Sequence, residues 1–301
     1  MALQDKLFYN RASAEKLGWN PTWFGAKEFN EMLLRNIKKF QKEHGVTADA
    51  LCGPTTFRLA NSAKEMEETL QEEEQLAGNH ITCEGQQVPI EWEKVVNLKG
   101  ENNLALPKGF RKYKENKRKP TMVVTHFDVC LSATSCKRVL EKKGISSHFV
   151  IDNDGTIYQM VDPQHEAWHA GTRRTNKTSI GVDISNAYYT KYQKWYRRKG
   201  FGNRPVLDNV KVHGVTLKEC LGFYPIQIQA YKALISCLCK QYDIPVECPL
   251  NDEGTLLREV HTPAKRGKYN GIVNHFHLTR KKIDTANLEM DKVLEEIRNG
   301  E

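Results

Sequence analysis

The second half of the chain alternates strand-like runs with stretches of helical periodicity, and this alternation constrains the fold most. β-Branched and aliphatic residues fill 121–129 and 176–186, whereas apolar residues recur at helical spacing over 224–242. Within 148–161, two apolar runs flank a segment from Asp152 to Gly155, which is a strong turn signal and predicts a β-hairpin. Strands that alternate with helices predict an α/β domain.

A change of composition separates this region from the N-terminal part of the chain. Residues 61–80 are rich in glutamate and contain few apolar residues, which is typical of a solvated helix or linker and not of a core. We therefore predict three segments: a helical domain over 1–62, an acidic linker or helix over 63–82, and the α/β domain over 83–301.

The N-terminal segment has amphipathic helical stretches between turn signals. Ile37, Phe40 and Phe57 are expected to point inward, and Gly45 is expected to end a helix in the left-handed conformation. Gly53 is followed by a proline, and this pair predicts the turn into the next helix.

Five residues of this segment, Phe40, Gln41, Asp49, Gly53 and Thr55, lie in a pattern that resembles the small three-helix peptidoglycan-binding module of bacterial and phage wall hydrolases. The resemblance covers roughly 50 residues and implies that these five residues bind peptidoglycan. A helical bundle without affinity for glycans is the alternative.

Candidate metal ligands gather near the C-terminus. Residues 272–284 contain His275, His277 and Asp284, and His126 ends the strand-like run at 121–129. A catalytic zinc ion takes three protein ligands of imidazole or carboxylate type and leaves one position open for water. Since His275 and His277 would point to opposite faces of a strand, we expect only one of them to face the metal, and we choose His275.

Five motifs follow one another in an order that resembles the zinc-dependent N-acetylmuramoyl-L-alanine amidase family, which includes phage endolysins, bacterial recycling amidases and peptidoglycan recognition proteins. They are His126 on its strand, the hairpin at 148–156, Ala-Trp-His-Ala-Gly at 167–171, Ser-Ile-Gly-Val-Asp-Ile at 179–184, and His275 with Lys282 and Asp284. The resemblance covers about 160 residues and implies a mixed central sheet flanked by helices.

The same resemblance implies roles for individual residues. His126, His275 and Asp284 match the family's zinc ligands, and Lys282 matches a lysine that helps to stabilise the oxyanion. Asp183 stands where the family often has a glutamate as general acid and base, and its side chain is one methylene shorter. The resemblance also implies hydrolysis of the amide between N-acetylmuramic acid and L-alanine.

The other aromatic and basic residues leave alternatives open. His148 and His169 are either satisfied core imidazoles or residues of a substrate cleft. Trp168 and His169 lie beside a glycine and suit a groove for a sugar or peptide, and His261 is expected at the surface. The aromatic and basic cluster at 191–199 could meet a glycan or phosphate, but a solvated part of an insertion at 187–222 is the favoured interpretation.

Three function classes compete. The leading hypothesis is a peptidoglycan amidase of the endolysin type, with a wall-recycling amidase as its alternative. A non-catalytic peptidoglycan-recognition protein would typically lack the third ligand, which Asp284 supplies here. A nucleic-acid binder would need clustered cations and stacking aromatics on one element, and only residues 191–199 come near that pattern.

Charge and cysteine content bear on location. The net charge of +8 suits any polyanionic partner, and the eight cysteines lack the spacing of a disulfide scaffold or zinc finger. Without a signal-like N-terminus or a long apolar run, we expect synthesis in the host cytoplasm, free thiols and no insertion into a membrane. We expect a monomer that reaches the wall after a holin permeabilises the inner membrane, with peptidoglycan and not nucleic acid as its partner.

Overall fold

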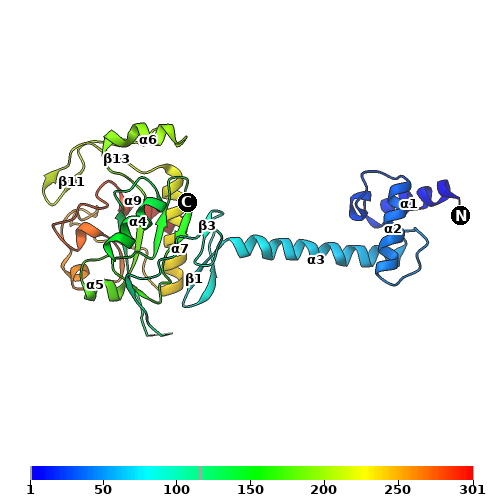
Figure 1. The fold of residues 1–301 in the computed structure, drawn as a ribbon, viewed down its shortest axis with the longest axis horizontal. Coiled ribbons are helices and arrows are strands. Elements are labelled where there is room, and N and C mark those ends of the chain that lie inside the picture. The colour runs from blue at the N-terminus through cyan, green and yellow to red at the C-terminus, as the bar shows by residue number, and fades with distance from the viewer. Residues whose placement is uncertain (1, 115–116, 301) are drawn as a thin grey trace. The chain divides into compact units, whose positions relative to one another are not determined.

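The computed structural model describes residues 2–114 and 117–300, apart from the side chains of 67–78. The chain divides into two compact units, Met1–Gln75 and Leu76–Glu301, and the division falls inside the predicted linker (Figure 1). The expected solvation of the glutamates between 67 and 74 lies outside the described side chains. Within the described ranges, no helix is long and apolar enough to cross a membrane.

Three α-helices and a short 3₁₀ helix form the N-terminal unit, as predicted: α1 (Leu3–Leu17), η1 (Pro21–Phe24), α2 (Glu31–Glu43) and α3 (Pro54–Gly78). Helix α2 begins where the Asn30 side chain accepts a hydrogen bond from the amide of Leu33, at 3.1 Å. Trp19, Leu33 and Ile37 are buried in the core between the helices, and Phe40 and Phe57 pack against that core.

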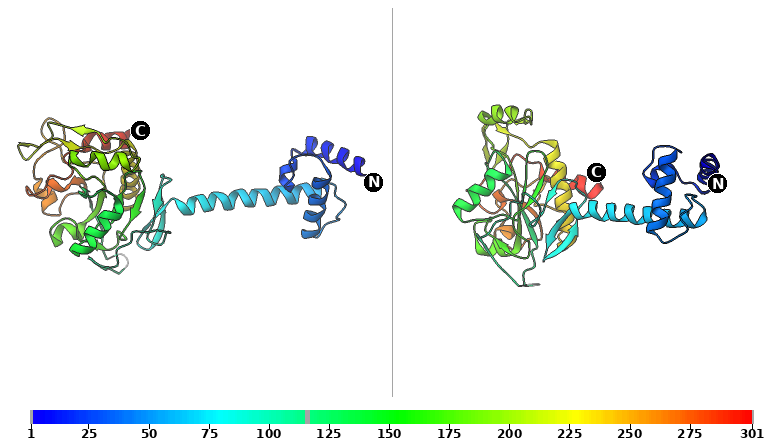
Figure 2. Two further views of the ribbon diagram at one scale, coloured as in Figure 1. Left: turned by 45° about the horizontal axis from the view of Figure 1, so that its top comes forward. Right: turned by 45° about the vertical axis from the view of Figure 1, so that its right-hand side comes forward.

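A six-stranded mixed sheet with helices around it forms the second unit, in agreement with the predicted α/β fold (Figure 1 and Figure 2). Its order is β14 (Gly271–Asn274), β5 (Met122–Phe127), β9 (Ser179–Ile184), β6 (Phe149–Ile151), β7 (Ile157–Gln159) and β3 (Val95–Val96). The first four strands are parallel, whereas β6 and β7 form the predicted antiparallel hairpin.

Among the described residues, four two-stranded ladders lie outside the central sheet. They are β1 (His80–Cys83) with β2 (Gln86–Pro89), β4 (Phe110–Arg111) with β8 (Glu166–Ala167), β10 (Val206–Leu207) with β13 (Cys220–Leu221), and β11 (Lys211–Val212) with β12 (Val215–Thr216). The helices of this unit are α4 (Ala133–Lys143), α5 (Arg173–Thr178), η2 (Thr190–Tyr192), α6 (Gln193–Arg198), α7 (Pro225–Tyr242), α8 (Thr262–Lys265), η3 (His275–His277) and α9 (Met290–Asn299).

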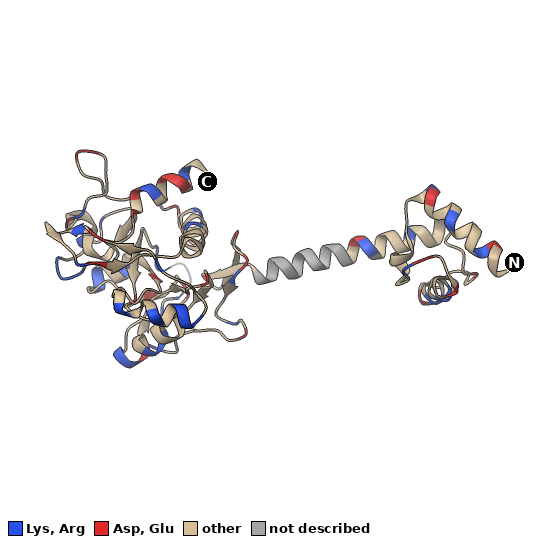
Figure 3. Ribbon diagram, turned by 90° about the horizontal axis from the view of Figure 1, so that it is seen from above, with Lys and Arg blue, Asp and Glu red and all other residues tan. Residues whose placement is uncertain are grey.

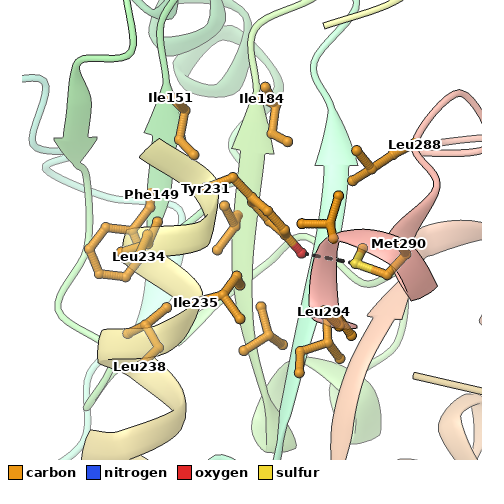
Figure 4. Packing of buried hydrophobic residues seen from close by; sticks show 14 of the residues in the cluster. Phe149, Ile151, Ile184, Tyr231, Leu234, Ile235, Leu238, Leu288, Met290 and Leu294 are labelled. Atoms are coloured by element: carbon orange, nitrogen blue, oxygen red, sulfur yellow. Dashed lines mark hydrogen bonds between the residues drawn. The ribbon is translucent and has the colours of Figure 1, made fainter. Parts of the chain in front are cut away.

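Alternate residues of the central strands enter different cores. Val123 and Phe127 of β5 belong to the large core that α7 and α9 cover, where Tyr231 contacts Met290 (Figure 4). Met122 and Val124 belong to a smaller core on the other face. The alternation puts His126 on the same face as Val124, and therefore away from α7.

The insertion at 187–222 is anchored by one buried cation, Arg204, whose exposed fraction is 2%. Its guanidinium lies between the rings of Tyr196 and Tyr224, 4.4 and 4.3 Å from their centroids. It donates hydrogen bonds to the carbonyls of Ser185 and Gly222 and to the side chains of Asn153 and Gln227. Tyr196 is completely buried, so the expectation of a wholly solvated segment was wrong for this ring.

Other cations of the insertion are exposed, in contrast to Arg204 and the aromatic rings around it. Five of them, Lys191, Lys194, Arg197, Arg198 and Lys199, lie in η2, in α6 or directly after α6. Lys and Arg residues also lie on other helices and loops of this unit (Figure 3), so the positive charge is not confined to one element.

Candidate metal centre

Three side chains from distant parts of the sequence meet at one edge of the sheet. His126 Nδ1 lies 3.0 Å from His275 Nδ1 and 3.0 Å from Asp284 Oδ2, and the last two atoms are 2.9 Å apart. The exposed fractions are 5% for His126, 5% for His275 and 6% for Asp284. The structure thus brings together the three residues that the resemblance implies as ligands.

Sheet topology explains why they meet. Strands β5 and β14 are adjacent and parallel, and Thr125 pairs with Asn274, so the next residue of each chain segment is a histidine at the same edge. The backbone around Asp284 lies against η3, because the amide of Phe276 donates to the carbonyl of Asp284 at 3.0 Å. A hydrogen bond between the side chains of Asn274 and Thr285 stabilises the same contact.

The electrostatics of this group favour an ionised carboxylate at Asp284. Burial alone would raise the pKa of Asp284, but the adjacent imidazoles of His126 and His275 hold that pKa below its ordinary value. Burial, with the neighbouring His126, lowers the pKa of His275. Two imidazole nitrogens and one carboxylate oxygen make a donor set that suits zinc, so the residues present fit this metal.

A pocket of about 200 Å³ opens beside the three side chains. Asp183 and Lys282 line it together with them, and Phe127, Val129 and Leu140 contribute apolar wall. All five residues predicted for the metal and for catalysis therefore border one cavity.

Asp183 lies next to His126 because β5 and β9 pair in register at these two residues. Its exposed fraction is 8%, and burial raises the pKa of its carboxyl, while the neighbouring His126 and the Ser147 hydroxyl oppose the rise. A buried carboxyl with a raised pKa can hold a proton and release it nearer to neutral pH than an exposed one.

His169 borders the same pocket and also contacts the candidate metal centre. Its Nδ1 lies 3.0 Å from His126 Nε2, and its Nε2 lies 3.2 Å from the hydroxyl of Ser179. Burial and the nearby imidazole of His126 lower the pKa of His169 well below its ordinary value. Trp168 is 40% exposed, and its amide donates to Ser146 in the pocket wall.

His148 is enclosed in the core, so the cleft-lining alternative is corrected here. Its exposed fraction is 0%. Its Nδ1 accepts a hydrogen bond from the amide of Gly181 at 2.9 Å, and its Nε2 lies 3.0 Å from the carbonyl of His165. Both ring nitrogens are used, which leaves none for a substrate.

His277 is excluded from the centre, but not for the predicted reason. Residues 275–277 form the 3₁₀ helix η3 and not a strand. His277 Nδ1 accepts from the amide of Asn274, its Nε2 lies 2.6 Å from the carbonyl of Leu257, and burial lowers its pKa to about 3. His261 is half-buried against the ring of Tyr269 and therefore not at the open surface.

Sequence reasoning did not single out Asp128, which lines the pocket two residues after His126. Burial raises the pKa of Asp128 to about 8, and its carboxylate accepts hydrogen bonds from Ser185 and from the amides of Cys130 and Asn186. The signal was present in the sequence, because residues two apart at the end of a strand lie on the same side.

A second pocket, of about 460 Å³, lies in the N-terminal unit. Four of the five predicted peptidoglycan-binding residues border it: Gln41, Asp49, Gly53 and Thr55. Phe40 packs against the core instead and stacks on His44, with ring centroids 4.0 Å apart. Tyr9, which was not predicted, also borders this pocket.

The Gln41 side chain holds the wall of that pocket together. Its amide nitrogen donates to Asp49, Leu51 and Thr56, and its oxygen accepts from the amide of Ala50. Since both polar atoms of this side chain have partners within the unit, Gln41 shapes the pocket wall.

Comparison with solved structures finds matches at low identity. The amidase AmiD from E. coli, in complex with anhydro-N-acetylmuramic acid-L-Ala-D-gamma-Glu-L-Lys, is 23% identical over 46% of this chain and 54% of that chain, with a TM-score of 0.30. This chain therefore spans about half the length of AmiD.

Two further solved structures cover more of the chain. The endolysin LysCS from Clostridium intestinale is 17% identical over 68% of this chain and 95% of its own, with a TM-score of 0.40. The catalytic domain of XlyA is 16% identical over 65% of this chain and 96% of its own, with a TM-score of 0.38. No curated protein matches the sequence.

A family profile described as N-acetylmuramoyl-L-alanine amidase matches residues 116–284, which is more than half of the chain. The matched range includes His126, Asp183, His275 and Asp284. The chain therefore belongs to the N-acetylmuramoyl-L-alanine amidase family.

Proposed function

We propose that this chain is a zinc-dependent peptidoglycan amidase that hydrolyses the bond between the lactyl group of N-acetylmuramic acid and L-alanine. One observation carries the proposal: His126, His275 and Asp284 converge beside a pocket inside the range that matches the family. These three residues would hold the metal. Bound zinc supplies Lewis-acid polarisation of the amide carbonyl and lowers the pKa of a water molecule to about 7.

Two further residues carry out proton transfer and charge stabilisation in the proposed reaction. Asp183 takes the proton of the attacking water and delivers it to the leaving amine of L-alanine, a role that its buried position and raised pKa support. In-register pairing with His126 supports this role for the shorter side chain, since both residues border the same pocket. Lys282 stabilises the negative charge that develops on the carbonyl oxygen.

Digestion of purified sacculi by the full chain, followed by mass spectrometry of the products, tests this function. The expected products are stem peptides with a free L-alanine amino group and glycan strands that keep their N-acetylmuramic acid. Asp183→Asn is expected to retain stoichiometric zinc and lose this activity. Cleavage of a glycosidic or peptide bond, or no cleavage by the zinc-loaded chain, would refute the assignment.

We further propose that the N-terminal unit binds peptidoglycan through the pocket that Tyr9 and Thr55 border. Tyr9 is 37% exposed and offers an aromatic face, as sugar-binding sites commonly do. In the full chain, Tyr9→Ser is expected to lower retention on inactivated sacculi. Phe8→Ser removes a neighbouring ring that is 76% exposed but does not border the pocket, and it should leave retention unchanged.

The pairing of such a unit with an amidase supports a lytic role. We propose a phage or prophage endolysin that acts on the wall after holin-type permeabilisation of the inner membrane. Expression of the chain together with a holin should lyse the host, whereas expression of either protein alone should not. Lysis by the chain alone would argue against this route.

A further inference from the structure

A partly buried series of hydrogen bonds extends behind His126, on the side away from the other candidate ligands. His126 Nε2 lies 3.0 Å from His169 Nδ1, and His169 Nε2 lies 3.2 Å from Ser179 Oγ. The hydroxyl of Ser179 donates to the carbonyl of Thr175 at 2.7 Å. Ser179 and Thr175 have exposed fractions of 0% and 1%, so bulk water does not replace these partners.

The carbonyl of Thr175 determines which atom donates in each hydrogen bond of the series. A carbonyl oxygen can only accept, so the single hydroxyl proton of Ser179 is committed to Thr175. Ser179 Oγ must then accept from His169 Nε2–H, which leaves a lone pair on Nδ1 of the neutral ring. His126 consequently donates from Nε2, and its Nδ1 lone pair faces His275 and Asp284.

The ring of His169 can occupy this place only because residue 181 is a glycine. A Cβ built on Gly181 would lie 2.7 Å from Cγ and 2.8 Å from Nδ1 of His169. The φ angle of Gly181 lies outside the left-handed region, so backbone conformation does not demand glycine there. Close approach of the imidazole to strand β9 is therefore the reason for glycine in the Ser-Ile-Gly-Val-Asp run.

The backbone of His169 is fixed as well. The side-chain oxygen of Asn176 accepts from the amides of His169 and Ala170, at 3.2 and 2.7 Å. Asn176 is itself buried. Ring, backbone and hydrogen-bonding direction are thus all determined before any ligand binds.

We propose that His169 is a positioning residue: with Ser179 behind it and Gly181 beneath it, His169 fixes the tautomer and ring orientation of His126 so that Nδ1 faces the metal. This inference rests on the proposed metal site. Hydrogen-bond partners of metal ligands orient those ligands and raise their basicity, and their loss typically weakens metal binding by roughly 10- to 100-fold.

Zinc affinity of the metal-free full chain, measured by competition with a chromophoric chelator, tests the proposal independently of activity. His169→Leu keeps the volume but removes the acceptor, and it should weaken zinc binding by roughly 10- to 100-fold. His169→Asn restores an acceptor near the position of Nδ1 and should bind within a few-fold of the original protein. His261→Asn, a substitution of an imidazole outside the series, is the control and should change nothing.

A spectroscopic measurement reads the tautomer directly. Long-range ¹H–¹⁵N spectra of the metal-free protein should show His126 protonated on Nε2, and Ser179→Ala should release His169 into a mixture of tautomers. Protonation of His126 on Nδ1, or wild-type zinc affinity in His169→Leu, would overturn the inference. Failure of the original protein itself to bind zinc would instead overturn the proposed function.

Gly181→Ala tests the position of the His169 ring without changing His169 itself. The added methyl group should displace His169 and weaken zinc binding, yet it should have little further effect in a chain that already carries His169→Ala. Equal effects of Gly181→Ala in the two backgrounds would show that glycine acts on the metal site by some other route, and would count against the proposed positioning.

Discussion

The buried imidazole of His148 makes folding of the amidase unit depend on pH, because the ring is neutral in the folded protein and titrates freely once the chain unfolds. Burial, reinforced by the positive charge of Arg118, lowers the pKa of His148 well below its ordinary value of 6.5. Between the folded and unfolded pKa values, the unfolded chain binds a proton that the folded chain does not. The contribution of His148 to the free energy of unfolding is therefore fully present above pH 6.5 and is lost as the pH falls below that value.

The size of the effect follows from these pKa values. Each pH unit below the unfolded pKa costs about 1.4 kcal/mol, so moving from about pH 8 to about pH 5 should remove about 2 kcal/mol of unfolding free energy through His148 alone. His169, His275 and His277 also have lowered pKa values and add to the total loss. A variant is needed to isolate the contribution of His148.

His148→Gln provides this comparison, because glutamine does not titrate. The variant should be less stable than the original protein at about pH 8, since it disturbs the bonds to Gly181 and His165. Its deficit should shrink by about 2 kcal/mol at about pH 5, while the other histidines cancel in the difference. Hydrogen exchange of the β9 amides in the metal-free chain measures both free energies. A deficit that is the same at the two pH values would refute the reasoning.

Three further predictions concern the pocket and the insertion. Asp284→Asn should abolish stoichiometric zinc by elemental analysis together with amidase activity, and retention of both would remove Asp284 from the site. Lys282→Met should keep zinc but lower kcat/KM by roughly 100- to 1000-fold, equivalent to about 3 to 4 kcal/mol. Lys281→Met, at the exposed neighbouring position, should leave kcat/KM unchanged. Arg204→Met leaves buried acceptors without a donor and should destabilise the unit by about 3 kcal/mol or more in urea unfolding. Arg197→Met at an exposed position should stay within about 0.5 kcal/mol, and equal losses would contradict the anchoring role.

Local patterns predicted the parts of the fold that depend on neighbouring residues. The β-branched runs became β5 and β9, the turn from Asp152 to Gly155 joins β6 to β7, and the apolar spacing over 224–242 became α7. Residues 275–277 were wrongly treated as strand, because three residues are too few for periodicity to separate a strand from a 3₁₀ turn.

Non-local contacts set the limit of the sequence-based prediction. His126 and His275 are 149 positions apart, and residue patterns do not encode the parallel pairing of β5 with β14 that brings them together. The family resemblance supplied that contact. It did not distinguish the enclosed ring of His148 from a cleft residue, because enclosure depends on hydrogen bonds to Gly181 and His165, which are both distant in sequence.

The position of β14 at the end of the sheet order has a consequence for biosynthesis. A ribosome adds His126 to the chain 149 positions before His275, so β14 and the other two donors are synthesised long after β5. A nascent or prematurely terminated polypeptide thus possesses one donor out of three and an unpaired β5 edge. The three donors can therefore meet only after residue 284 has been synthesised, so a product that stops before Asp284 lacks the complete candidate metal centre.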